Sequence, residues 1–151
     1  MDLICFAPTD KYFSHLTSDV LDDLQSVDNV DIYKTIENFS KRITRPKKLD
    51  TIIIICAERK QDLKKLLSYK DFLNNTKIIL VLPDREKETI DVSLLFFPRF
   101  YIFADQDFKQ IYAVVKKMHQ KITVRKNNIN KNTNKRERVT KKSKQNKGQF
   151  N

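Results

Sequence analysis

Glycine is nearly absent from this sequence: Gly148 is the only one among 151 residues. P-loops and dinucleotide-binding turns need several glycines, because only a residue without a side chain lets the backbone approach a phosphate closely. These nucleotide-binding motifs are therefore excluded in their usual form.

Cysteine, histidine and long apolar runs are also scarce. The cysteines Cys5 and Cys56 are too few for a disulfide framework, and the histidines His15 and His119 add no recognisable set of zinc ligands. The sequence shows no signal peptide and no apolar run of membrane-spanning length. We expect a cytoplasmic protein without a cofactor, in which both thiols are buried and inert.

Positive charge is concentrated near the C-terminus. The chain has a formal net charge of +11, of which residues 125–151 contribute +9, from ten Lys/Arg and one acid, Glu137. Residues 1–124 hold 20 basic and 18 acidic residues, or +2. The basic segment contains too few large apolar residues to offset the entropy of ordering. The sequence therefore predicts a folded domain over 1–124 and a disordered basic tail over 125–151.

Hydrophobic periodicity in residues 1–124 alternates between the patterns of strands and helices. The stretch Thr51-Ile-Ile-Ile-Ile-Cys-Ala-Glu-Arg59 is typical of a strand buried on both faces. Residues 86–96 are ambiguous, and Thr9 or Asp10 and then Asp107 are candidate helix caps. Strands are predicted at 3–7, 30–33, 49–56, 77–82 and 99–103. The clearest helical stripes are Phe13, Leu16, Val20, Leu24 and Val27, and Phe108, Ile111, Val115, Met118 and Ile122.

Five alternations of strand and helix predict an α/β domain of the (βα)5 type, with a doubly wound parallel five-stranded sheet. The element order, the stretch Leu49-Asp-Thr-Ile-Ile-Ile-Ile and the stretch Phe100-Tyr-Ile-Phe-Ala-Asp-Gln-Asp-Phe-Lys-Gln-Ile resemble the receiver domain of bacterial response regulators. The resemblance covers about residues 1–122. It implies a flavodoxin-like sheet in the order 2-1-3-4-5 and a role in bacterial signal transduction.

Active receivers need acids after strand one, a phosphoacceptor aspartate ending strand three, a hydroxyl ending strand four and a lysine ending strand five. None of the corresponding positions in this chain supplies the required group, so receiver-type phosphoryl transfer lacks its chemistry. The resemblance thus implies a degenerate pseudo-receiver that is not an enzyme. The positions are Ala7 and Pro8, Ile55 or Cys56, Leu82 or Pro83, and Phe103 or Ala104.

Several acids nevertheless follow the predicted strands. Because the carboxyl ends of parallel strands share one edge, a divalent-metal site for phosphate-ester chemistry is a weaker alternative. Helix capping and interaction with helix dipoles explain the same acids without a ligand, so we expect no metal. The acids are Asp10, Glu58, Asp84, Asp105 and Asp107.

Two kinds of surface are candidates for binding a partner. In the receiver resemblance, the face formed by residues 88–112 docks a protein partner, which is either another protein or a second copy of this chain; its apolar residues are alternatively core. Basic residues are candidates for contacts with nucleic acid or an acidic partner, or form only a solvated face and a solubilising tail. They are Lys41, Arg42, Arg45, Lys47, Lys48, Arg125, Lys126, Lys131, Lys135, Arg136, Arg138, Lys141, Lys142, Lys144 and Lys147.

The leading hypothesis is a non-catalytic pseudo-receiver interaction module whose basic tail adds electrostatic affinity. The alternative is a small nucleic-acid-binding protein that uses the tail and the Lys41–Lys48 cluster. An enzyme built on the acidic edge is the third interpretation.

Overall fold

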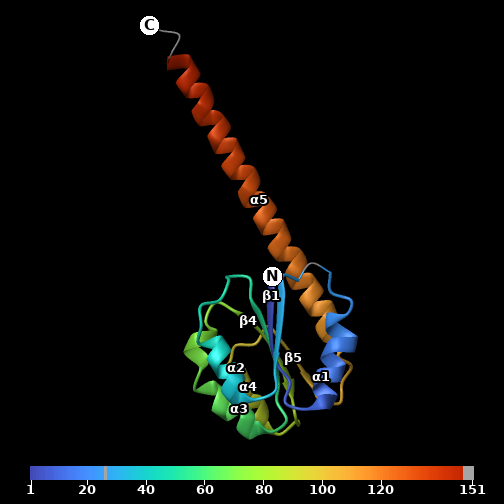
Figure 1. The fold of residues 1–151 in the computed structure, drawn as a ribbon. Coiled ribbons are helices and arrows are strands. Elements are labelled where there is room, and N and C mark those ends of the chain that lie inside the picture. Colours follow the sequence, from blue (N-terminus) through green and yellow to red (C-terminus); the bar gives the residue numbers. More distant parts are fainter. Residues whose placement is uncertain (26, 148–151) are drawn as a thin grey trace. The chain divides into compact units, whose positions relative to one another are not determined.

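Five parallel strands form a single sheet in the order β2-β1-β3-β4-β5 (Figure 1). The computed structural model describes residues 1–25 and 27–147, and their side chains as far as Arg136. The predicted α/β class and strand order are confirmed, and they are consistent with a flavodoxin-like fold. The strands are β1 (Asp2–Phe6), β2 (Asn29–Tyr33), β3 (Ile52–Cys56), β4 (Lys77–Leu82) and β5 (Phe100–Phe103).

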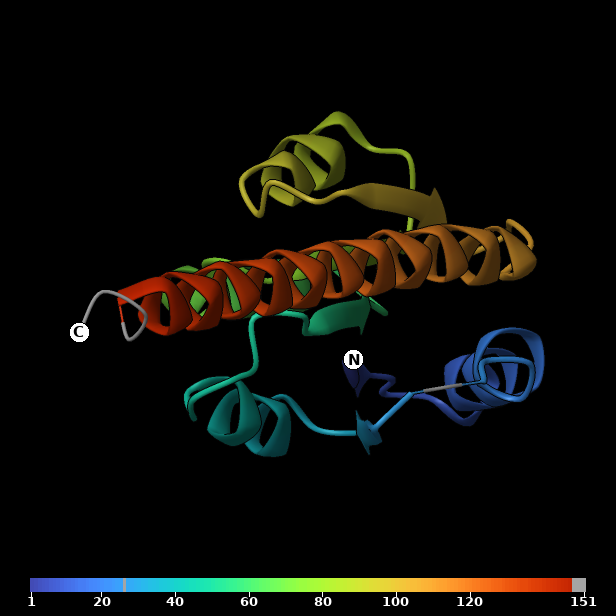
Figure 2. The ribbon, with the colours of Figure 1, turned by 90° about the horizontal axis from the view of Figure 1, so that it is seen from above.

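Helices cover both faces of the sheet. Residues Met1–Lys116 form one compact unit and the chain from Lys117 a second. In the first unit, one face is covered by α2 (Ile36–Ile43), α3 (Lys60–Leu67) and α4 (Lys87–Leu94) (Figures 1 and 2). The other face is covered by α1 (Asp10–Leu16), the π-helical turn η1 (Thr17–Leu21) and the first residues of α5 (Lys109–Lys147). A 3-10 turn, η2 (Lys70–Leu73), precedes β4.

The centre of the sheet is buried on both faces, as the isoleucine run predicts. All five residues of β1 and of β3 are buried. Ile53 and Ile55 belong to one core cluster with residues of α2 and α3, such as Phe39 and Leu63. Strand β3 is shorter than the predicted 49–56: a turn closed by the Thr51 hydroxyl on the Lys48 carbonyl (2.7 Å) precedes it.

The first helix differs in register from its predicted stripe. Tyr12, Leu16 and Val20 are buried, whereas Phe13 is 38% exposed. Thr9 caps the helix, because its side chain accepts a hydrogen bond from the Tyr12 N–H. The Thr17 hydroxyl donates to the Phe13 carbonyl (2.9 Å), and such back-bonding bends helices. The π-helical turn that follows keeps Val20, four residues after Leu16, on the buried face.

The ambiguous segment 86–96 contains α4, and the last helix is longer than expected. The Asp107 carboxylate accepts the Lys109 N–H (2.9 Å) at the start of α5. The helix runs to Lys147, where the sequence predicts a disordered tail from residue 125. Proline and glycine are missing between residues 99 and 147, so no residue there forces the helix to end.

Disorder of residues 125–147 in solution stays a prediction, because a solvated helix with few apolar side chains is only marginally stable. Residues 148–151 of the expected tail lie outside the described residues. Among the residues that are described, no helix is both long and apolar enough to cross a bilayer.

Candidate functional site

The carboxyl ends of the strands form the lower edge of the sheet in Figure 1. Hydrogen bonding continues for one residue past three of the strands. The N–H groups of Ala7, Ala57 and Ala104 donate to carbonyls of the neighbouring strand at 2.8, 3.0 and 2.8 Å. An alanine thus follows each of these three strands and extends the backbone hydrogen bonding of the sheet by one residue.

The eight positions that the receiver resemblance assigns to a phosphorylation site all lie along this edge. None carries a carboxylate, a hydroxyl or an amine. Their backbones are held by strands β1, β3, β4 and β5 and the residues just after them, where an active receiver holds its catalytic groups. Ala7, Ile55, Cys56 and Leu82 are fully buried, and Pro8, Pro83, Phe103 and Ala104 are partly buried.

The two thiols lie on the same face of neighbouring strands. Cys5 pairs in register with Ile54, so Cys56 lies two residues further along β3. Both are free and buried. Burial raises the pKa of the Cys5 thiol to about 12 and holds the pKa of Cys56 well above its usual value. Both thiols are protonated at neutral pH and are poor nucleophiles.

Tyr12 covers the end of β3 from the α1 side. Its hydroxyl donates to the Ala57 carbonyl (3.2 Å), and its ring stacks on Phe108 with centroids 6.2 Å apart. Burial is the main reason that the pKa of Tyr12 rises to about 12. The sequence analysis missed this residue, although its spacing of four from Leu16 and then Val20 indicates the inner face of a helix.

The five acids that follow the strands are dispersed among local roles. Asp10 pairs with Lys34 at 3.3 Å, and Asp107 caps α5. Asp84 accepts the Glu86 N–H at 3.0 Å. Glu58 is exposed, and Asp105 pairs with Arg85. Among the described residues, no three His, Cys, Asp or Glu side chains are grouped closely enough to hold a metal ion.

Arg85 and Asp105 connect the segments that follow β4 and β5. Two hydrogen bonds of 2.9 Å join them, and the guanidinium lies 4.3 Å from the centroid of the Phe103 ring. The hydrogen bonds lower the pKa of Asp105 and raise that of Arg85. A cavity of about 250 Å³ lies beside the pair, lined also by Lys11 and Pro83.

Apolar side chains are exposed at the end of α4 and on β5, a surface that we call the α4–β5 face. Its exposed members are Leu94, Leu95, Phe97 and Tyr101. Phe96, between them, is 3% exposed and belongs to the core cluster. The predicted docking face, residues 88–112, is therefore partly exposed and partly core, since its buried apolar residues are Phe96, Ile102, Phe108 and Ile111.

Phe97 is the most exposed residue of this face, at 76%. Its φ of 51° is left-handed, which costs a residue with a side chain about 1–2 kcal/mol. Glycine normally takes this position after a helix. The Phe97 N–H donates to the Leu94 carbonyl (3.0 Å), and the ammonium of Lys70 lies 4.7 Å from the ring centroid.

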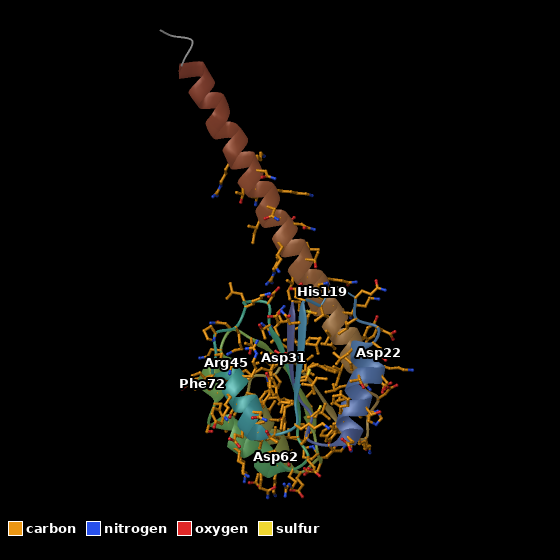
Figure 3. All side chains as sticks on the ribbon, viewed as in Figure 1. Asp22, Asp31, Arg45, Asp62, Phe72 and His119 are labelled. Atoms are coloured by element: carbon orange, nitrogen blue, oxygen red, sulfur yellow. The ribbon has the colours of Figure 1, made fainter. Side chains whose placement is uncertain are left out.

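The basic cluster at residues 41–48 is largely engaged within the fold. Three of its cations pair with acids: Lys41 with Glu37 (3.3 Å), Arg42 with Asp31 (3.3 Å) and Lys48 with Asp2 (3.6 Å). Lys47 donates to the Ile43 and Arg45 carbonyls, and burial lowers its pKa. Arg45, labelled in Figure 3, is exposed beyond α2. This cluster is therefore a weaker phosphate-binding candidate than its sequence suggests.

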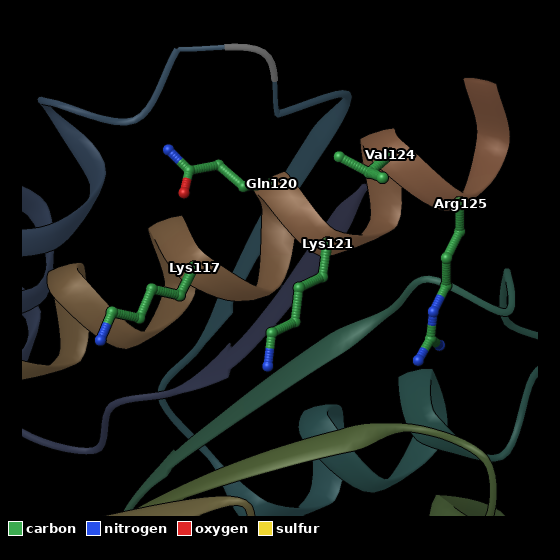
Figure 4. A pocket seen from close by; sticks show the side chains of 5 residues that line it. All are labelled: Lys117, Gln120, Lys121, Val124 and Arg125. Carbon is green, nitrogen blue, oxygen red and sulfur yellow. The ribbon is translucent and has the colours of Figure 1, made fainter. Parts of the chain in front are cut away.

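The second unit presents a different basic surface. Lys117, Lys121 and Arg125 project on the same side of α5, one helical turn apart (Figure 4). The sequence analysis missed Lys117 and Lys121, although their spacing of four with Arg125 marks one helix face. Of the predicted basic contacts, Arg125, Lys126, Lys131, Lys135 and Arg136 are exposed on the same helix. The side chains of Arg138, Lys141, Lys142, Lys144 and Lys147 lie outside the described part of the chain.

Comparisons with known proteins add no identity to this geometry. No protein-family model matches the chain. A search of curated proteins also finds no match.

Proposed function

We propose that this protein is a non-catalytic, receiver-like interaction module that binds a protein partner through the α4–β5 face. The four exposed apolar side chains of that face are the observation that carries the proposal. The basic part of α5 adds electrostatic affinity for an acidic surface.

Exposed apolar residues are common one by one, but here four are exposed within the short segment 94–101. Burying a side chain such as Phe97 or Leu94 in an interface contributes about 1.5–3 kcal/mol. Backbone strain of the kind found at Phe97 is concentrated at functional sites in proteins. Together these observations favour an interface with an aromatic residue at its centre.

The edge of the sheet supports the non-catalytic part of this proposal. Where a receiver accepts a phosphoryl group, this chain has a buried, protonated thiol at Cys56. Where a receiver needs a hydroxyl and a lysine, the side chains are apolar, and Arg85 and Asp105 pair nearby. The residues of this edge lack the groups that transfer a phosphoryl group, which supports a binding role over a catalytic one.

A photo-crosslinking amino acid at position 97 tests the docking face in cells. The matched control is position 13, because Phe13 is also an exposed aromatic residue with a lysine, Lys34, over its ring. We expect a discrete protein adduct from position 97 and none from position 13. The adduct is then identified, and Phe97→Ser should weaken binding of the purified partner at least tenfold while Phe13→Ser does not.

Sedimentation velocity separates a second copy from a different partner. A concentration-dependent dimer that Phe97→Ser dissolves identifies the partner as the protein itself. Equal crosslinking from positions 97 and 13 would contradict the proposed docking face. So would a partner that binds Phe97→Ser as tightly as it binds the wild-type protein.

The second candidate function is nucleic-acid binding, and one observation favours it. Residues 109–136 of α5 contain nine Lys/Arg and no Asp or Glu. Since three cations of the 41–48 cluster are paired with acids, α5 rather than that cluster carries this second function.

A further inference from the structure

The charge of the second unit is continuous and of one sign. Residues 117–136 hold seven Lys/Arg and no acid, so the helix offers its cations no carboxylate from within this segment. At a rise of about 1.5 Å per residue the segment is about 30 Å long. Duplex DNA carries one negative charge per roughly 1.7 Å of its axis, so its phosphates outnumber these cations over that length.

The cations follow one face of the helix rather than being scattered. Lys117, Lys121, Lys131 and Lys135 fall on a single stripe with Val124 and Asn128, at alternating spacings of four and three. Arg125 extends this face on the side that Lys117 and Lys121 share (Figure 4). Like charges four residues apart destabilise an isolated helix, and a row of phosphates would remove that repulsion. The arrangement therefore suits an anionic ligand better than it suits the free helix.

The remaining side chains favour a duplex over a single strand. No Phe, Tyr or Trp lies between Tyr112 and Phe150, so the segment lacks the large stacking platforms on which single strands bind. An α-helix with its side chains is about 10–12 Å across, which matches the major groove of about 12 Å. The segment is also rich in amides, which contact base edges and phosphates. These are Gln120, Asn127, Asn128, Asn130, Asn132 and Asn134.

We infer that residues 117–136 of α5 bind double-stranded DNA by lying in its major groove, with Lys117, Lys121, Arg125, Lys131 and Lys135 on the phosphates. This inference rests on the second candidate function and specifies its ligand and its residues. It extends the interface to Lys117 and Lys121, which lie before the predicted tail.

Fluorescence anisotropy of the full-length protein with a labelled duplex of about 20 base pairs tests the inference. Five phosphate contacts give a slope of log affinity against log salt of about −4 to −5. We expect the affinity to fall about 10²–10³-fold between 50 and 200 mM salt. Circular dichroism should show an increase in helix content when duplex is added.

Two variants with the same change in net charge locate the contacts. The triple variant Lys117→Gln, Lys121→Gln, Arg125→Gln should bind at least tenfold more weakly and lose about three units of salt slope. The control carries Lys11→Gln, Lys65→Gln and Lys87→Gln, which are exposed positions of the first unit. It should change the affinity by less than twofold. Equal losses in the two variants would show that only net charge matters and would overturn the interface.

Other outcomes distinguish failure of this inference from failure of the second candidate function, nucleic-acid binding. If the matching single strand binds as tightly as the duplex, nucleic-acid binding stands and the groove inference is wrong. If polyglutamate displaces the duplex at equal charge concentration, the ligand is any acidic polymer and the inference is also wrong. If neither nucleic acid binds at 50 mM salt, the inference and the second candidate function fail together. Phe97→Ser should leave DNA affinity unchanged, because the docking face is a separate proposal.

Discussion

Arg85 and Asp105 form a bidentate ion pair, with two hydrogen bonds of 2.9 Å, beside the edge where a receiver would be phosphorylated. Phe103 lies beneath the guanidinium. The pair joins the segment before α4 to the segment after β5.

The pH dependence of this ion pair gives the first prediction. The Arg85 hydrogen bonds lower the pKa of Asp105, so the pair stabilises the fold fully above the usual aspartate pKa. The contribution is lost as the pH falls through the lower, folded-state pKa. Asp105→Asn should therefore reduce the melting temperature at pH 7 and reduce it less near pH 2, because protonation of the wild-type carboxyl weakens the same pair as the pH falls. Asp91→Asn, at an exposed acid of α4, is the control, and an equal effect of Asp105→Asn at both pH values would contradict the pairing.

The second prediction concerns the core. Ile53 has no solvent exposure and pairs in register with Ile4 and Ile78. Ile53→Ala should lower the free energy of unfolding by about 2–5 kcal/mol, through lost burial and the cavity that remains. Leu49→Ala is the control, because Leu49 is 88% exposed and should change the free energy by less than about 0.5 kcal/mol. Urea denaturation measures both, and similar values would show that β3 is not central.

The third prediction concerns the reactivity of the thiols. Burial raises the pKa of both Cys5 and Cys56, so the native protein should react with iodoacetamide at pH 8 only as fast as it opens. In urea both thiols should be alkylated rapidly. Ser18→Cys places a thiol at an exposed position and should react at the rate of a free cysteine. Rapid alkylation of native Cys56 would reopen the possibility of a nucleophile at the sheet edge.

The fourth prediction is that acetyl phosphate does not phosphorylate the protein. The eight positions that the resemblance assigns to a phosphorylation site contain no acid, hydroxyl or lysine. They therefore lack the groups that bind magnesium and accept a phosphoryl group. Intact-mass spectrometry after incubation with acetyl phosphate and magnesium should show no adduct. A magnesium-dependent, base-labile gain of one phosphoryl group would contradict the pseudo-receiver proposal, and a bona fide receiver domain is the positive control.

The fifth prediction concerns residues 125–151. A synthetic peptide of this segment should be largely unfolded by circular dichroism, because its like charges repel and it has few apolar side chains to pack. Deleting the segment should leave the thermal transition of residues 1–124 nearly unchanged. A fall in melting temperature of more than a few degrees would mean that the segment contributes to the stability of the folded domain.

The strands were predictable because a buried parallel sheet imposes a strong pattern on the sequence. Residues such as Ile52–Ile55 must be apolar on both faces, and proline is tolerated only at strand margins, where Pro8 and Pro83 lie. The fold class follows from repeating this pattern five times, whereas the strand order was implied by the receiver resemblance. The start of β3 was less predictable, because the turn at Thr51 depends on one hydroxyl hydrogen bond.

The candidate surfaces depend on contacts that periodicity does not encode. Tyr12 and Phe13 are adjacent aromatics, and the cap and the π-helical turn decide which one faces the core. Arg85 meets Asp105 only because β4 pairs with β5. The left-handed backbone at Phe97 is also hidden, since glycine rather than phenylalanine is the usual signal for it.

Strand β1 precedes both of its partners in the chain yet lies between them, with Ile4 paired to Asp31 on one side and Ile53 on the other. As the chain is synthesised, this apolar strand stays without its second neighbour until residues up to Cys56 have emerged. Long-range pairing of this kind slows folding and leaves apolar surface open to aggregation or chaperones. The N-terminal half of this domain is therefore most exposed to aggregation during synthesis, before β3 has emerged to pair with β1.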